Sequence, residues 1–193
     1  SMARPWLTTI LAAVAALFAY AAAPAGAQSG PPGGSYSSNE LISTGHRFFG
    51  TVSGGLATVI EKAVAQYGQP NGYILGEEGS GAIGAGLRYG EGTLHTRDQG
   101  QHRIFWQGPS LGWDIGGEGA RTMMLVYNLP AVGAIYNRFG GVDGSAYFIG
   151  GFGMTALVNN NVYVVPVRAG VGMRLGVALG YLKFTPTATW NPF

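Results

Sequence analysis

Apolar residues recur every three or four positions between Ser38 and Pro70, which is the spacing of one face of an α-helix. The pattern predicts a helical segment over residues 38–70, with Ser38 as its N-cap and Gly68 and Pro70 at its end. Several glycines weaken this segment, so we expect a break near Gly50 or close packing against a flat surface. The apolar face consists of Leu41, Phe48, Val52, Leu56, Val59, Ile60, Ala63, Val64 and Tyr67.

This helical segment has two alternative partners, the rest of the protein or a membrane surface. Helices that lie on membranes carry many Lys and Arg residues on their polar side. The polar side here lacks such a set of basic residues. We therefore favour a helix packed on the domain that follows.

From Gly72 onward the period of the pattern changes to two, which is typical of β-strands. Each strand has one bulky apolar face and one face of glycine with scattered charge, as in residues 83–90 and 111–116. Turn signals at residues 98–100, 143–144 and 159–161 separate the strands. We count seven or eight strands, with a short helix around 130–139. The parity from Val167 to Tyr181 favours one long strand bent at residues 170–176.

Periodicity does not decide which face of these strands points inward. A soluble barrel buries the bulky face, whereas an outer-membrane barrel turns that face to lipid and keeps its charges inside. Phe193 is a feature shared with outer-membrane barrels, but Pro186 and Pro192 interrupt the last strand and several strands are short for a membrane. The expected fold is therefore mainly β: a small soluble antiparallel β-barrel of about seven to eight strands, with the N-terminal helical segment packed on it.

The N-terminus has the three-part layout of a secretory signal peptide. Arg4 precedes an uncharged apolar run, and an A-x-A site ends at Ala27, before Gln28. We expect cleavage between Ala27 and Gln28, a flexible linker over 28–37 and one domain over 38–193, with its barrel over 71–193. The alternative is a retained membrane anchor. Ser1 resembles a cloning scar.

Cleavage would place the mature protein in the periplasm of a Gram-negative bacterium without a membrane span. No cysteine is present, so disulfides, thiolate metal sites and an acyl anchor are excluded. Loss of Arg4 leaves 10 of the 11 basic residues against 9 acidic ones, and no basic cluster supports binding of nucleic acid. Glycine contributes 34 of 193 residues, well above the average of about 7%, and needs a structural reason.

Candidate chemistry in the sequence is sparse. Residues 79–84 match the dinucleotide pattern G-x-G-x-x-G, but the sequence after it alternates like a strand and does not open a helix. Glu77 and Glu78 are adjacent, so in a strand they point to opposite faces and do not form an acid/base pair. We therefore expect no catalytic residues and no cofactor.

The histidines and the aromatic residues are the candidate binding groups of the sequence. His46, His95 and His102 lack ligand spacing, so we expect no metal site. Aromatic residues at a barrel mouth can hold a lipid or a glycan. The candidates for such an aromatic rim are Trp106, Trp113 and Tyr127.

Two segments carry a family resemblance, residues 86–92 (GLRYGEG) and 104–114 (IFWQGPSLGWD), together with the signal peptide and the helical region. The sequence resembles the alphaproteobacterial envelope integrity protein A family, formerly a domain of unknown function. More remotely, residues 108–110, 115–118 and 123–127 resemble the lipid-binding SYLF (Ysc84-type) domain.

The first resemblance implies a small periplasmic β-barrel that supports envelope integrity and stress resistance, with a connection to the lipopolysaccharide or O-polysaccharide layer. It implies no enzymatic activity. We expect the protein to bind a lipid, glycolipid, glycan or envelope protein. The alternatives are a small outer-membrane barrel and a periplasmic enzyme acting on envelope glycolipid, for which the histidines, Asp114 and Glu118 are the candidate groups.

Overall fold

The computed structural model describes residues 34–80, 86–109, 120–170 and 180–193 of the chain. Two α-helices come first, α2 (Ser38–Phe49) and α3 (Gly54–Tyr67), and a 3-10 helix, η1 (Val132–Ile135), follows later. The strands are β1 (Gly72–Ser80), β2 (Leu87–Thr96), β3 (Gln101–Pro109), β4 (Ala120–Tyr127), β5 (Arg138–Gly141), β6 (Tyr147–Ile149), β7 (Phe152–Met154), β8 (Leu157–Asn159), β9 (Val162–Ala169) and β10 (Tyr181–Thr185).

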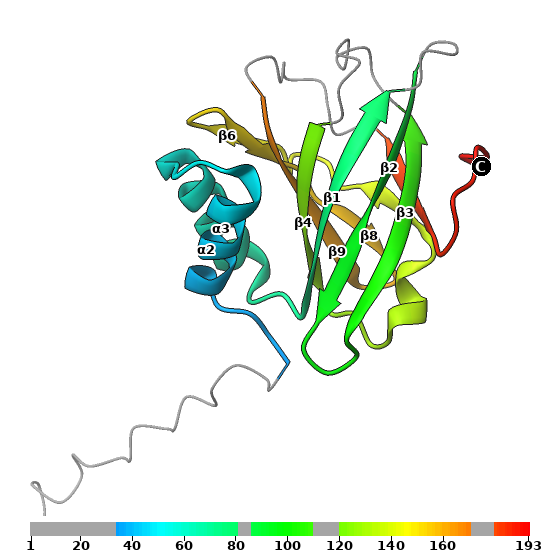
Figure 1. Cartoon of the computed structure of the whole chain (residues 1–193), viewed down its shortest axis with the longest axis horizontal. Coiled ribbons are helices and arrows are strands. Elements are labelled where there is room, and N and C mark those ends of the chain that lie inside the picture. The colour runs from blue at the N-terminus through cyan, green and yellow to red at the C-terminus, as the bar shows by residue number, and fades with distance from the viewer. Residues whose placement is uncertain (1–33, 81–85, 110–119, 171–179) are drawn as a thin grey trace, which may run out of the picture. The chain divides into compact units, whose positions relative to one another are not determined.

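Eight of these strands form a closed antiparallel barrel (Figure 1). The order around the ring is β4-β1-β2-β3-β10-β5-β8-β9, and β9 pairs with β4 to close it. The short strands β7 and β6 extend the sheet beside β9. The structure confirms the predicted mainly-β barrel, its strand number and its packed helical segment.

The helical segment divides at Gly50, as its glycines predicted. Gly50 ends α2 in the left-handed conformation, with φ of 73°, which costs glycine little. The cap of α2 is Ser37, one residue before the expected Ser38, because the Ser37 hydroxyl accepts from the Glu40 N–H and the Glu40 carboxylate accepts from the Ser37 N–H. Ser53 caps α3 in turn.

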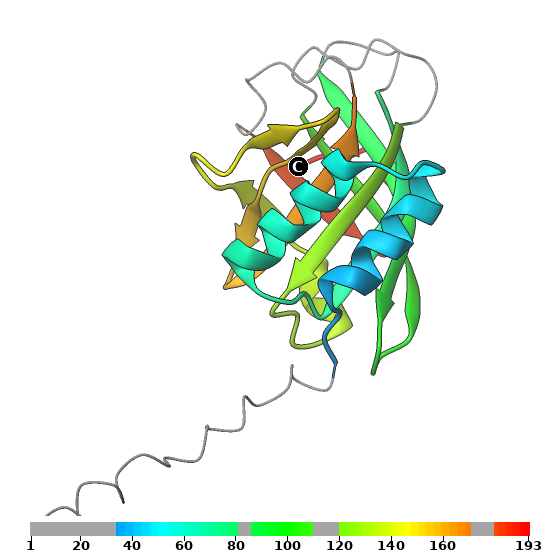
Figure 2. The ribbon, with the colours of Figure 1, turned by 90° about the vertical axis from the view of Figure 1, so that its left-hand side faces the viewer.

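Both helices lie against one half of the barrel wall (Figure 2). Their apolar side meets the outward side chains of β4 and β9, and the cluster between them is buried. Its fully buried members are Leu41, Leu56, Val59, Ile60, Ala63, Met123, Leu125, Val165 and Val167. The strands of this half are therefore apolar on both faces, one toward the helices and one toward the barrel interior.

The barrel interior is a packed apolar core in its described part. Side chains from all eight strands of the barrel fill it, and residues in and near η1 add to it. The members are Ile74, Leu94, Ile104, Trp106, Met124, Val126, Leu129, Ile135, Phe139, Leu157, Val162, Val164, Leu182 and Phe184.

On β2 the expectation that the face with the bulky apolar residues points into the barrel is wrong. Leu94 lies in the interior core and Arg88 reaches the buried Glu78, so the even-numbered face of β2, which includes Gly90, is the inner one. The bulkier odd-numbered residues Leu87 and Tyr89 face outward. Trp106 explains this reversal, because its indole occupies the space in front of the glycines. A Cβ on Gly90 would collide with the indole ring, and one on Gly76 would lie 2.6 Å from Trp106 Cη2.

The predicted long strand from Val167 to Tyr181 is corrected as well. The strand β9 ends at Ala169 and pairs with β4, β7 and β8, whereas β10 begins at Tyr181 and pairs with β3 and β5. Two strands with different neighbours replace one bent strand, and residues 171–179 lie outside the described residues. The short helix expected around 130–139 is confirmed as η1.

Candidate ligand-binding groove

A groove crosses the outer face of β1, β2 and β3, on the half of the barrel that the helices leave open. Antiparallel register places Glu77 beside Glu91, and Glu91 beside Phe105. The adjacent row contains Gly79, Tyr89 and Gln107. Because neighbouring positions along a strand point to opposite faces, these two rows share the outer face.

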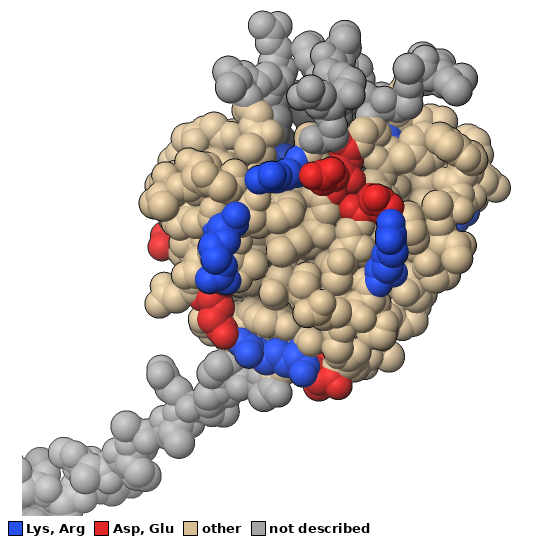
Figure 3. Space-filling model, in the orientation of Figure 1, with Lys and Arg blue, Asp and Glu red and all other residues tan. Residues whose placement is uncertain are grey.

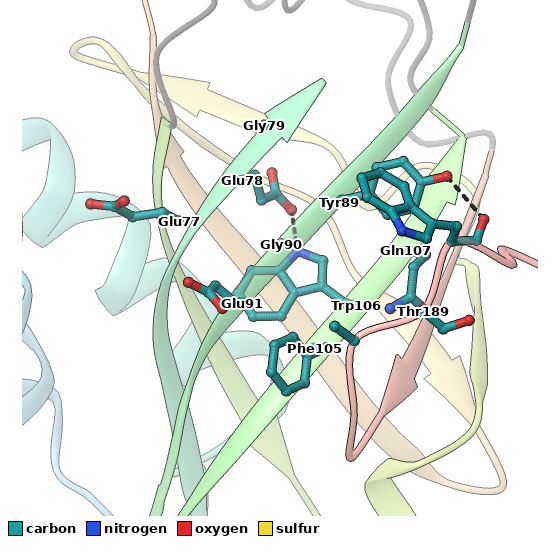
Figure 4. Close-up of a pocket in the computed structure, with 12 residues that line it drawn as sticks. Glu77, Glu78, Gly79, Tyr89, Gly90, Glu91, Phe105, Trp106, Gln107 and Thr189 are labelled. Carbon is teal, nitrogen blue, oxygen red and sulfur yellow. Dashed lines mark hydrogen bonds between the residues drawn. The ribbon is translucent and has the colours of Figure 1, made fainter. Parts of the chain in front are cut away.

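The segment after β10 forms one wall of this groove through Ala188, Thr189 and Trp190. The rings of Tyr89 and Trp190 meet edge to face, with centroids 5.1 Å apart, and the Tyr89 hydroxyl donates to the Trp190 carbonyl at 3.1 Å. Trp190 itself remains 80% exposed. The open groove has a volume of about 340 Å³, and Figure 4 shows its lining side chains.

A buried ion pair lies directly behind the groove floor, inside the barrel. The Glu78 carboxylate accepts two hydrogen bonds from Arg168, both at 2.8 Å, and one from Trp106 Nε1 at 2.8 Å (Figure 4 shows the latter). Arg88 Nη1 lies 4.0 Å from the same carboxylate. Burial by itself raises the pKa of Glu78, but the guanidinium of Arg168, with Arg88 and Trp106, outweighs it and holds that pKa below its ordinary value.

The charged residues that line the groove are all carboxylates: Glu77, Glu78 and Glu91. Glu77 and Glu78 point to opposite sides of β1, as the sequence predicted, with Glu77 exposed and Glu78 only 5% exposed. Glu91 pairs with Arg103 at 2.8 Å on the surface. In Figure 3, acidic side chains lie next to one another on the face of the molecule formed by these strands, with Lys and Arg side chains on either side of them.

Gln107 belongs to the same outer row but is only 1% exposed. Its Nε2 donates to the Thr185 hydroxyl at 3.1 Å. Its Oε1 accepts no hydrogen bond from any described residue, although it is buried and the residue lines the groove. Buried side-chain oxygens are usually paired in proteins, so this acceptor is unusual.

The structure separates the residues that the sequence placed in an aromatic rim. Trp106 is fully buried and points into the barrel, with its edge behind the groove floor. Tyr127 points the other way, beneath the helices, where burial raises its pKa. Trp113 and the expected cleavage site at Ala27 and Gln28 lie outside the described residues, as do Asp114 and Glu118.

The groove residues that sequence reasoning missed are Tyr89, Phe105, Gln107 and the wall position of Trp190. Tyr89, Phe105 and Gln107 occupy alternate positions on β2 and β3, which indicates that they share one face. The sequence does not show that this is the outer face until the inward face of the barrel is known. Trp190 lies in an irregular segment, where periodicity carries no information.

The three histidines lie in separate places. His46 Nε2 lies 3.1 Å from the Ser53 carbonyl oxygen, and His102 Nε2 lies 2.6 Å from that of Gln99. His95 stacks on Tyr73 at 4.7 Å, and burial lowers the pKa of His95. Within the described ranges, no group of three His, Asp or Glu side chains is placed to hold a metal ion.

None of the helices in the described part of the chain combines the length and apolar character needed to cross a membrane.

The fold and groove define a small closed antiparallel β-barrel protein with a helical pair on one half of its wall and an open groove on the other. The model of the family described as envelope integrity protein A matches residues 34–193, and the chain belongs to this family. The family match confirms the first resemblance seen in the sequence and supports a role in envelope integrity. The remoter likeness to the SYLF domain stays an expectation.

A solved structure supports the same fold. A β-barrel-like, uncharacterized protein from Brucella abortus is 58% identical in sequence, with a TM-score of 0.78. The match covers 82% of this chain and 99% of that one. No match was found among the curated proteins.

Proposed function

We propose that this protein is a periplasmic binding protein that maintains envelope integrity by holding an envelope component in the groove on β1, β2 and β3. Family membership supports the envelope role. The apolar N-terminal run and its A-x-A site support export. The family resemblance further suggests that the bound component belongs to the lipopolysaccharide or O-polysaccharide layer.

The contrast between the groove and the barrel interior carries this proposal. The described interior is filled by apolar side chains and the Glu78–Arg168 ion pair, and the cavity beside Arg88 and Arg168 measures about 20 Å³, which is room for one water molecule. The groove measures about 340 Å³, within the range of ligand sites, which starts at roughly 300 Å³. This contrast favours a ligand bound on the outside of the barrel over one carried within it.

The outer surface also favours a periplasmic protein over an outer-membrane barrel. A lipid-facing barrel surface is an apolar band. Here α2 and α3 cover the wall at β4 and β9, and β2 and β3 carry the exposed Glu91–Arg103 pair. Recovery in the soluble periplasmic fraction is the expected result of cell fractionation, and recovery with outer-membrane proteins would contradict it.

Filling the groove tests whether it is needed for envelope integrity. A Cβ on Gly79 meets no described atom within 4 Å, so Gly79→Phe adds a bulky side chain at the groove with no clash at its Cβ. Gly140 on β5 has equally open space and does not line the groove, so Gly140→Phe is the matched control. Both variants are introduced into a bacterial strain that lacks its own copy of the family gene.

Survival of these strains in detergent is the measurement. We expect Gly140→Phe to restore resistance and Gly79→Phe to fail, with equal amounts of folded protein in both strains. Full restoration by Gly79→Phe would show that the groove is dispensable and would overturn the proposed function.

A further inference from the structure

We infer that the ligand of the groove is a saccharide whose polar groups donate hydrogen bonds, either neutral or bearing an amine, and that the groove rejects anionic ligands. The inference rests on the proposed function of the groove and adds the chemical class of its ligand. Three independent features of the lining lead to it: aromatic faces, unsatisfied acceptors and the sign of the charge.

The aromatic feature consists of Trp190, Tyr89 and Phe105. The face of an aromatic ring carries partial negative charge, and the C–H groups on one side of a sugar ring carry partial positive charge, so the two surfaces attract. Trp190 is 80% exposed, yet its ring meets Tyr89 edge to face and the Tyr89 hydroxyl donates to its backbone carbonyl. A held but exposed indole offers a flat surface of this kind.

The acceptor feature consists of Gln107 and Glu77. Gln107 lines the groove, and its Oε1 is buried and accepts no hydrogen bond from the described residues. Glu77 is exposed, and no described basic side chain lies within ion-pair distance of it. A ligand that fits both groups must donate, as hydroxyl and ammonium groups do and as phosphate and carboxylate groups do not.

The charge feature excludes anions. The charged lining residues are carboxylates, and the exposed guanidinium groups on the neighbouring strands are already bonded: Arg103 pairs with Glu91, and Arg121, opposite Glu77 on β4, donates to the Phe48 carbonyl. Bringing a phosphate or carboxylate near Glu77 places like charges together. A saccharide therefore fits the groove better than the anionic head group of a phospholipid, although both could reach an exposed tryptophan.

The first experiment measures binding of probe saccharides to the full-length protein by ligand-observed NMR and tryptophan fluorescence. The probes are an oligomer of N-acetylglucosamine, the matching oligomer of glucosamine and an oligomer of galacturonic acid of equal length. We expect the first two to bind and the anionic oligomer to bind at least about tenfold more weakly, the size of one charge-assisted hydrogen bond.

Variants connect this binding to the groove. Trp190→Ala should weaken binding of the neutral oligomer about tenfold or more, the effect of losing a stacking surface. Phe193→Ala should leave binding unchanged, because Phe193 is a similarly exposed aromatic residue of the same segment that does not line the groove. Glu77→Gln should reduce the preference for glucosamine over galacturonate oligomers while binding of the neutral oligomer persists.

Several outcomes would overturn the inference. Failure of every saccharide to bind would do so, as would equal effects of Trp190→Ala and Phe193→Ala. Binding to anionic phospholipid vesicles or to a basic peptide that depends on Trp190, without saccharide binding, would name a different ligand class.

The ligand class and the proposed function fail separately. If Gly79→Phe abolishes detergent resistance but no saccharide binds, the groove is needed for envelope integrity and the inference of a saccharide ligand is wrong. If saccharides bind through Trp190 but Gly79→Phe restores resistance, the ligand class is confirmed and the proposed function is wrong.

Discussion

The barrel wall has two halves, and they differ in how their outward side chains are covered. On β4 and β9 the outward side chains are apolar, and α2 and α3 cover them. On β2 and β3 the outward rows mix aromatic and polar side chains, and the helices leave them open. The strand β1 belongs to both halves, because its outward Tyr73 and Leu75 pack on the helical cluster while Glu77 and Gly79 line the groove.

This difference shows how a small barrel can separate stability from binding. The covered half has two apolar layers, one on each side of the strands, and supplies most of the large buried side chains outside the interior core. The open half has only one buried layer, the barrel interior, so its outer side chains do not have to be apolar and can contact a ligand. The glycines of β1 and β2 let Trp106 pack flat behind that floor.

The largest expected effect comes from the ion pair that lies inside the barrel behind both halves. Glu78→Gln leaves the buried charge of Arg168 without its partner, so the free energy of unfolding should fall by about 3–5 kcal/mol. Glu77→Gln, one residue away on the outer face, is the matched control and should change stability little. Urea unfolding at neutral pH measures both variants, and equal losses would contradict the division between inner and outer faces.

The same pair of variants gives a pH test with a defined sign. The pKa of Glu78 is lowered in the folded state, so its carboxylate contributes stability above the unfolded value of about 4.3 and loses that contribution as pH falls through the lower folded value. The difference between the native protein and Glu78→Gln should therefore shrink with acid. Glu40, whose pKa falls to about 2 through its bonds to Arg97 and Ser37, is present in both proteins, so its contribution cancels in the difference between them.

The sequence predicted much of this fold because local rules decide it. The break at Gly50, the alternation of the strands and the opposite directions of Glu77 and Glu78 follow from positions along one segment. The inward face of β2 does not, because the space in front of Gly90 is filled by Trp106 from β3, a partner whose register no single segment specifies. The groove was missed for the same reason: it combines residues of three strands with Trp190, which lies far along the chain.

A substitution in the helical cluster perturbs only the covered half. Leu56 on α3 is fully buried beside Gly45, whose added Cβ would lie 3.1 Å from Leu56 Cδ2. Leu56→Ala should lower the free energy of unfolding by about 2–5 kcal/mol, since a tightly packed site leaves a cavity. Leu87→Ala, at a half-buried leucine on the outer face of β2, should cost clearly less. Saccharide binding by folded Leu56→Ala should persist, and its loss would show that the halves are coupled.

The smallest expected effect on stability belongs to Trp190→Ala on the open half. The indole is 80% exposed and its main structural bond, from the Tyr89 hydroxyl, ends on the backbone carbonyl, which the substitution retains. The free energy of unfolding should therefore change by no more than about 0.5 kcal/mol, as at ordinary surface positions. A loss of several kcal/mol in thermal or urea unfolding would mean that the tryptophan holds the segment after β10 in place. A stable variant that no longer binds would instead show that this ring is retained for its ligand, because the fold gains little from leaving it in water.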